Sequence, residues 1–174
     1  MKKLFFILIF LSATLFVSAQ EEFKPLFKIP SIVVTDIDGN KINTADLTNN
    51  GKPFIISFWA TWCKPCVKEL TTIADVYQDW QDETGVKLIA VSVDNSRSVA
   101  QVKPMVNGKN WEYQVLLDVN NEFKRAMNVN AVPHTFLVNG KGEVVWQHTS
   151  FSEGAELELI NLVKELEKSE SSSK

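Results

Sequence analysis

Two cysteines, Cys63 and Cys66, are the residues of this sequence best suited to chemistry. They are the only cysteines in the chain, and they stand two residues apart in the segment "WATWCKPC". A structural disulfide stabilises a protein mainly by closing a long loop of the unfolded chain, and a bridge between positions 63 and 66 closes almost none. The pair is therefore better explained by reactivity than by stabilisation of the fold.

The segments on either side of the cysteines indicate how they would react. A nearly unbroken apolar run at residues 53–59 is typical of a buried strand, and an amphipathic helix follows, with Pro65 in its first turn and Gly85 as its stop. A thiol at the start of a helix lies near unpaired N–H groups and the positive end of the helix dipole, which stabilise a thiolate. We therefore predict that Cys63 is the more exposed nucleophile and Cys66 the shielded resolving thiol.

Thiol-disulfide exchange is the reaction that such a pair supports. The Cys63 thiolate attacks a partner disulfide, a mixed disulfide forms, and Cys66 then displaces the partner as the two cysteines join. We expect no cofactor besides this redox-active disulfide. Lys64 adds a nearby positive charge that favours the reduced form. Because comparable pairs have potentials from about −270 to about −120 mV, the spacer leaves the direction of electron flow open.

The remaining sequence alternates between strand and helix patterns. Further strands are predicted at residues 86–93, 113–117, 134–138 and 143–148. Helices are predicted at residues 97–108, interrupted by Pro104, at 121–127, and after a capping box of Ser150 and Glu153. A turn at residues 38–40 predicts an N-terminal β-hairpin. This order predicts an α/β fold with a central mixed sheet, helices on both sides and the cysteines at the end of a central strand.

The N-terminus has the pattern of a secretory signal peptide. Lys2 and Lys3 precede an uncharged apolar run of 14 residues, and small residues end at Ala19. Because the run is shorter than the roughly 20 residues of a membrane-spanning helix, we expect cleavage after Ala19. We therefore predict an exported, periplasmic protein; an uncleaved signal peptide acting as a membrane anchor is the alternative.

After the signal peptide at residues 1–19, we expect a lead-in at 20–28, one domain at 29–168 and a disordered tail at 169–174. Removing the signal peptide takes away two of the 18 basic residues and none of the 21 acidic ones, which leaves a formal charge of −5. This acidic balance argues against a nucleic-acid partner. We expect a monomer.

Two motifs resemble a known family. "FWATWCKPC" and, some seventy residues later, "VPHTF" are similar to the thioredoxin superfamily, specifically its exported TlpA-like and ResA-like thiol-disulfide oxidoreductases. The resemblance spans residues 29–166 and implies a thioredoxin-like fold. It also implies that Pro133 is a cis-proline facing the disulfide, and that Val132 offers backbone groups to an extended substrate.

The same resemblance implies which partners the protein has and in which direction it transfers electrons. Members of this family keep cysteines of other exported proteins reduced, often for cytochrome c maturation. It therefore implies that this chain is a reductant of exported proteins that contain cysteines, and that a membrane electron donor recharges its dithiol.

One departure from thioredoxin concerns proton transfer. The aspartate that thioredoxin buries before its first cysteine is Ser57 here, and the lysine paired with it aligns to Ala90. In ResA-like proteins a glutamate three residues after the second cysteine accepts a proton, and Glu69 stands at that position. A partly desolvated carboxylate of raised pKa near Cys66 suits this role. The alternative, that Glu69 lies on the solvated face of its helix, stays open.

Several further residues near the cysteines are candidates for substrate contact. We assign Trp62 to the active-site surface and Trp59 to the core, and group Trp62 with Lys64, Pro65, Val132, Pro133 and His134. The family commonly has threonine in place of His134. A histidine at the start of a strand is more often structural than catalytic, and we adopt that interpretation. If it reached Cys63, it would add pH dependence to thiolate formation.

Three other functions compete with exchange. The cysteines with His134 and His148 could bind copper in an exported chaperone, although copper chaperones of this fold class use a wider cysteine spacing. A peroxiredoxin-like peroxidase shares the fold but lacks the C-x-x-C pair. A purely structural disulfide in a binding module is countered by the short loop that it would close.

Overall fold

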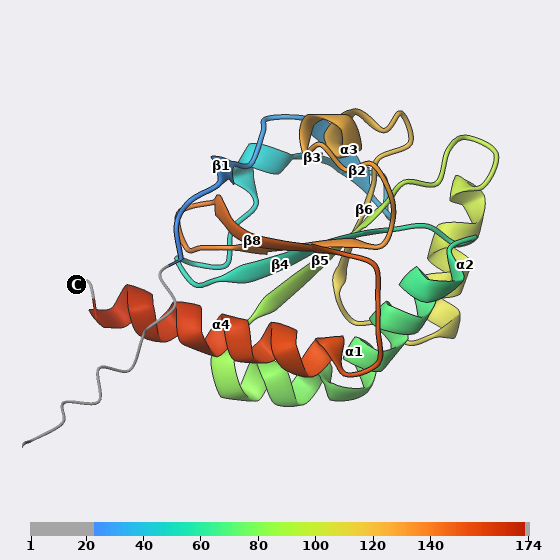
Figure 1. The fold of residues 1–174 in the computed structure, drawn as a ribbon. Helices are drawn as coiled ribbons and strands as arrows, with labels where there is room; N and C mark the ends of the chain where they lie inside the picture. The colour runs from blue at the N-terminus through green and yellow to red at the C-terminus, as the bar shows by residue number, and fades with distance from the viewer. Residues whose placement is uncertain (1–22, 173–174) are drawn as a thin grey trace, which may run out of the picture.

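A mixed β-sheet with helices on both faces forms the body of the protein (Figure 1). The computed structural model describes residues 23–172. The strands are β1 (Phe27–Lys28), β2 (Val33–Asp36), β3 (Lys41–Asn43), β4 (Phe54–Trp59), β5 (Lys87–Ser92), β6 (Gln114–Leu117), β7 (His134–Val138) and β8 (Glu143–Thr149). The helices are α1 (Lys64–Thr84), α2 (Val102–Gly108), α3 (Glu122–Ala126) and α4 (Ala155–Ser172), with 3-10 turns η1 (Thr44–Asp46) and η2 (Val99–Gln101). The predicted α/β class is confirmed.

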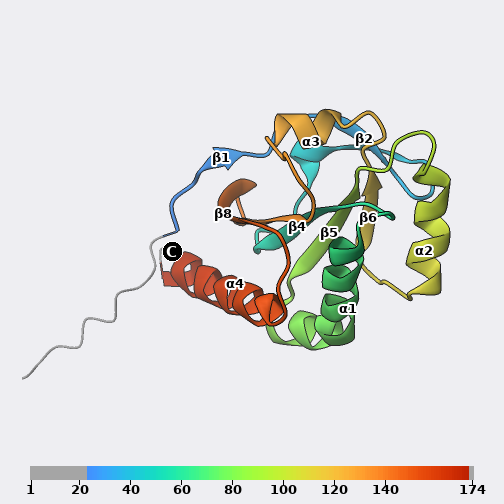
Figure 2. The ribbon, with the colours of Figure 1, turned by 45° about the vertical axis from the view of Figure 1, so that its right-hand side comes forward.

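The strand order places the cysteine-bearing end of β4 in the middle of the sheet. The order is β1-β8-β7-β4-β5-β6-β2-β3, in which β4, β5 and β6 are parallel and the other pairings are antiparallel. Helices α1 and α4 lie side by side on one face and α3 lies on the other (Figures 1 and 2). Because β4 is covered on both faces, all six of its residues are buried, which explains its unbroken apolar sequence.

Helix α1 follows the sequence pattern closely. Its buried stripe includes Leu70, Ile73, Tyr77 and Trp80, and it ends at Gly85, whose left-handed φ of 71° suits glycine. Pro104 does not interrupt α2, because it lies in the first turn of this helix, where a backbone N–H has no intrahelical partner. The predicted helix at 97–108 is instead divided into η2 and α2.

The hairpin prediction is confirmed by β2 and β3, which pair through the turn after Asp36. Strand β1 was not predicted: it lies in the expected lead-in and pairs with β8, with Phe27 opposite Val144. Local sequence carries little signal for so short a strand, because its pairing partner is distant in the chain.

The expected C-terminal boundaries were wrong. Helix α4 begins at Ala155 without the capping box of Ser150 and Glu153, and the Glu153 carboxylate pairs instead with Lys68 of α1. The helix also continues through Ser172, so residues 169–172 are helical where a disordered tail was expected. The Glu170 carboxylate accepts the N–H of Gly140 at 3.1 Å, which ties this last turn to the β7–β8 turn.

The predicted signal peptide at residues 1–19 lies outside the described residues. Within residues 23–172, no helix is long and apolar enough to cross a membrane.

Candidate active site

The cysteine pair lies at the first turn of α1, directly after the end of β4. Cys63 is the N-cap residue of α1, and Cys66 donates its backbone N–H to the Cys63 sulfur at 3.3 Å. The two sulfurs form a disulfide. Cys63 is 6% exposed and Cys66 is completely buried, in the order that the sequence predicted. A negative charge on the Cys63 sulfur would therefore be stabilised by an N–H group and by the helix dipole.

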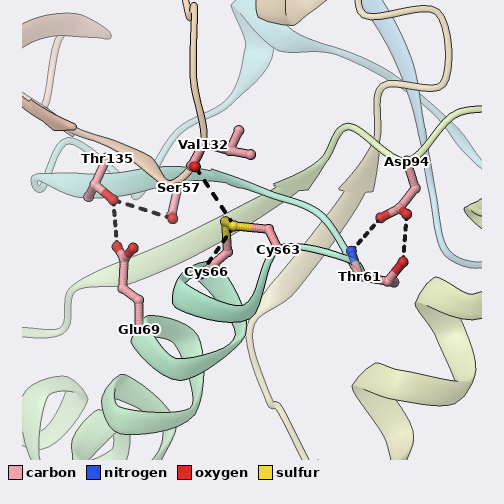
Figure 3. The surroundings of a disulfide bond; sticks show 8 residues. All are labelled: Ser57, Thr61, Cys63, Cys66, Glu69, Asp94, Val132 and Thr135. Atoms are coloured by element: carbon pink, nitrogen blue, oxygen red, sulfur yellow. Dashed lines mark hydrogen bonds between the residues drawn. A yellow bond between two sulfur atoms is a disulfide. The ribbon is translucent and has the colours of Figure 1, made fainter. Parts of the chain in front are cut away.

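The loop before β7 lies against this disulfide. The Val132–Pro133 peptide bond is cis, as the resemblance implied. The carbonyl oxygen of Val132 lies 3.7 Å from the Cys63 sulfur (Figure 3). Of the two tryptophans beside the cysteines, Trp62 is 64% exposed and Trp59 is fully buried, as expected. Lys64 and Pro65 are also exposed, so the disulfide has an accessible rim.

Glu69 lies on the buried face of α1, and the alternative that it belongs to the solvated face is wrong. Only 6% of the residue is exposed. Its Oε1 accepts a hydrogen bond from the Thr135 hydroxyl at 2.6 Å, and the Thr135 Oγ1 lies 3.3 Å from the Ser57 Oγ (Figure 3). Burial raises the pKa of Glu69 to about 7, although the hydroxyls of Thr135 and Ser57 act in the opposite direction.

The positions of the thioredoxin aspartate and lysine hold no charge here. Ser57 of β4 and Ala90 of β5 are opposite each other in the parallel ladder, and both are completely buried. Glu69 lies over this same face of the sheet, one helical turn after Cys66. Its carboxylate approaches Ser57 through the Thr135 hydroxyl, which lies between the two side chains.

His134 lies on the opposite face of β7 from Thr135. Its ring stacks on Phe136, and its nitrogens lie 3.1 Å from the Gln147 Oε1 and 3.3 Å from the Thr149 Oγ1. Burial lowers its pKa, against the opposing effect of the Gln147 hydrogen bond. These contacts agree with the structural interpretation of this residue.

Asp94 is a buried residue near the cysteines that the sequence analysis missed. It follows β5, and its carboxylate accepts the Thr61 N–H at 2.8 Å and the Thr61 hydroxyl at 2.6 Å (Figure 3). The carboxylate also accepts the Ser92 hydroxyl at 2.9 Å. These bonds fix the turn that leads into Cys63. The available signal was an acidic residue directly after a buried parallel strand, at the edge of the sheet where the cysteines also lie.

The structure gives no support to a metal centre in its described part. Among residues 23–172, no group of three or more His, Cys, Asp or Glu side chains is arranged to hold a metal ion. His134 and His148 are on neighbouring strands, but His134 pairs with Thr149 and His148 with Thr135, so the two imidazoles point to opposite faces of the sheet.

The fold and the dithiol site define a thioredoxin-like protein, and comparison with known families agrees. Residues 25–147 match the model of the AhpC/TSA family. The chain belongs to this family.

Individual proteins similar to this chain are named as thiol-disulfide oxidoreductases or as thioredoxin-like. The chain is 37% identical over 118 residues to the thiol-disulfide oxidoreductase ResA of Bacillus thuringiensis, covering 68% of this chain and 65% of that protein. It is 34% identical over 136 residues to ResA of Bacillus subtilis, covering 78% of this chain and 73% of that protein. An uncharacterised thioredoxin-like protein from Porphyromonas gingivalis has 54% identity and a TM-score of 0.71, over 79% of this chain and 90% of that one.

Proposed function

We propose that this protein is a thiol-disulfide oxidoreductase in which Cys63 is the nucleophile and Cys66 the resolving cysteine. The observation that carries this proposal is the Cys63 sulfur at the N-cap of α1, which receives the Cys66 N–H at 3.3 Å and keeps a small exposed surface. The relatives named ResA support the same chemistry. No cofactor takes part.

In the direction of substrate reduction, the Cys63 thiolate attacks one sulfur of the substrate disulfide, and the other substrate sulfur leaves as a thiolate. Cys66 then loses its proton and attacks the Cys63 sulfur, so that the second substrate thiolate leaves and the Cys63–Cys66 disulfide forms. The substrate gains two electrons, and the protein releases one proton from Cys66.

Glu69 is the proposed acceptor of that proton. It follows Cys66 by one turn of α1, it is buried, and its pKa is raised by burial to about 7. A carboxylate with a pKa near the working pH can both take up and release a proton, which is what a general base in a reversible reaction requires.

The rim of the disulfide is the proposed substrate surface. Exposed Trp62 offers an apolar face, and the backbone of Val132 before Pro133 lies against the Cys63 sulfur, where an extended peptide could pair with it. Lys64 and Pro65 border the same surface. His134 follows Pro133 at the start of β7, and its contacts with Phe136, Gln147 and Thr149 give it a structural role in this proposal.

We further propose that the protein is exported and acts as a reductant. The N-terminal pattern of residues 1–19 supports export, most simply to the periplasm. The ResA-like resemblance supports reduction of cysteines in exported proteins, of the kind needed for cytochrome c maturation, with a membrane electron donor as second partner. The reduction potential tests this direction: a value near about −120 mV would contradict a reductant.

The decisive experiment on the exchange chemistry uses a Cys66→Ala variant. Incubated with an oxidised protein substrate, it should accumulate a mixed disulfide on Cys63, detected by mass spectrometry under non-reducing conditions. A Cys63→Ser variant is the matched control and should form none. If Cys66→Ala only lost stability and trapped no partner, the disulfide would be structural and the proposal would fail.

The competing functions are tested on the same preparations. Tight stoichiometric binding of Cu(I) by the reduced protein would favour a copper chaperone. The AhpC/TSA family match gives the peroxidase alternative a concrete basis. Rapid peroxide consumption that persists in Cys66→Ala would favour it over disulfide exchange.

A further inference from the structure

A small cavity lies behind Glu69, between α1, β7, β8 and the start of α4. Its volume is about 20 Å³, and its polar lining includes Glu69, Thr135, His148, Ser150 and Glu156. A cavity of roughly 10–15 Å³ can hold one water molecule if two to four polar groups are within hydrogen-bonding reach of it. The cavity is therefore large enough for one water molecule, which would lie among these polar groups, although apolar side chains such as Ile73, Phe151 and Leu159 form much of the lining.

The Glu69 carboxylate has one oxygen available for such a water. Its Oε1 accepts the Thr135 hydroxyl, whereas its Oε2 is buried and has no hydrogen-bond partner among the described residues. Buried polar atoms are nearly always hydrogen-bonded to protein or to ordered water. A water in the cavity would donate a hydrogen bond to Oε2.

His148 connects this cavity to the solvent. The register of β7 and β8 places His148 opposite Thr135, so both side chains lie on the same face of the sheet as Glu69. His148 is exposed, and its ring stacks on Trp146 with the ring centres 5.8 Å apart. An imidazole has two ring nitrogens and can accept a proton on one while it releases a proton from the other, which a relay to solvent requires.

We propose that a single water in this cavity links the Oε2 of Glu69 to the imidazole of His148, and that this link is the route by which the Cys66 proton reaches solvent. The inference rests on the proposed role of Glu69 as proton acceptor. Cys66 gives its proton to the carboxylate, the carboxylic acid gives a proton to the water as the water gives one to His148, and the imidazolium releases it. Charge and protons balance without an added reactant.

Other ionisable groups face the same space. On α4, the half-buried Glu156 has one oxygen occupied by the Gly154 N–H at 3.1 Å. Across α1, the hydroxyl of Tyr113 donates to the Leu70 carbonyl, and burial raises its pKa further above the neutral range. Cys66 is the proton source. His148 is thus the exposed basic group among those that border the cavity or face Glu69.

The experiment follows the protonated Glu69 carboxyl band by infrared spectroscopy after a rapid pH change. Full-length oxidised protein, His148→Gln, and the control Glu158→Gln are compared; Glu158 is exposed on α4 and does not line the cavity. Proton equilibration of Glu69 should slow by about tenfold or more in His148→Gln, and imidazole added to the buffer should restore it. Thermal stability should stay unchanged. An unaltered rate in His148→Gln would overturn the proposal.

A second variant tests the water itself. Ala155→Leu places a larger side chain in the cavity and should exclude the water, which would slow equilibration and raise the pKa of Glu69 further. A rate equal to that of the unaltered protein in a folded Ala155→Leu variant would also overturn the route. If that variant does not fold, His148→Gln decides alone.

The proposed function can fail separately. If Glu69→Gln exchanged disulfides at the normal rate, Glu69 would not be the proton acceptor, whatever the path between its carboxylate and solvent.

Discussion

Two buried carboxylates flank the disulfide, and their surroundings differ. Asp94, on one side, accepts three hydrogen bonds, from the N–H and hydroxyl of Thr61 and the hydroxyl of Ser92. Glu69, on the other side, accepts one hydroxyl on Oε1 and none on Oε2 from the described residues. Both carboxylates lie close to the disulfide in space (Figure 3), but only Asp94 has hydrogen-bond donors to both of its oxygens among the described residues.

The difference indicates what each carboxylate can do. Three hydrogen bonds hold the Asp94 carboxylate in place, so Asp94 acts as a fixed anchor for the turn before Cys63. Burial with few donors favours the neutral form, which raises the pKa of Glu69 to about 7. The number of donors, more than depth of burial, separates the anchoring carboxylate from the proton-exchanging one.

The sharpest test of this comparison is the replacement of Glu69 by glutamine. Glutamine keeps the size of the side chain but cannot accept the Cys66 proton, so resolution of the mixed disulfide at neutral pH should slow by about 100-fold. Single-turnover stopped-flow kinetics with an oxidised substrate measure this rate. Alkylation of Cys63 in the reduced variant is the control and should be little changed. An unchanged resolution rate would make Glu69 another structural carboxylate.

Removing Asp94 should affect stability instead. In Asp94→Ala the Thr61 N–H and the hydroxyls of Thr61 and Ser92 lose their acceptor, and the free energy of unfolding should fall by about 4 kcal/mol. Urea denaturation of the oxidised protein measures it. The matched control Ser92→Ala removes one of the three donors together with the acceptor of the Asp94 N–H, and should cost about 2 kcal/mol. Equal losses in the two variants would show that Asp94 does not anchor the turn.

The pH dependence of stability should report the buried carboxyl group of Glu69. Below pH 4.5, the ordinary pKa of the group, Glu69 is protonated in both folded and unfolded states, so its burial carries no ionic cost. Between that value and about 7 only the folded state keeps the proton, so stability falls as the pH rises, by up to about 3 kcal/mol. Above about pH 7 the loss is complete. Urea denaturation across this range should show this decline in the unaltered protein and its absence in Glu69→Gln; parallel profiles would contradict the raised pKa.

The smallest predicted effect concerns the Thr135 hydroxyl, which donates to the Oε1 of Glu69. Thr135→Val keeps the shape of the side chain but removes the hydroxyl that donates to Oε1, so the pKa of Glu69 should rise by about one further unit. Infrared titration of the carboxyl band measures the shift. Thr149→Val is the control, because that hydroxyl contacts His134 on the other face of the sheet. A pKa that stayed near 7 would mean that desolvation alone sets it.

Features determined within a few residues of each other were predictable from the sequence. The apolar run at 53–59 became β4, Pro65 and Gly85 bounded α1, and the turn after Asp36 joined β2 to β3. The resemblance correctly implied the cis bond before Pro133. The prediction of a disordered tail was wrong for residues 169–172. The Glu170 carboxylate accepts the N–H of Gly140, which is distant in the sequence, and no local pattern reveals this hydrogen bond.

The sequence alone determined the reactive pair and the helix that activates it, since a thiol, a helix start and a stop signal are all local. The tertiary structure alone decided how many hydrogen-bond donors each buried carboxylate has. Glu69 is separated by 66 positions from Thr135, and Asp94 by 33 from Thr61. The register of the sheet sets which donors meet which carboxylate, and that register depends on packing across the whole domain.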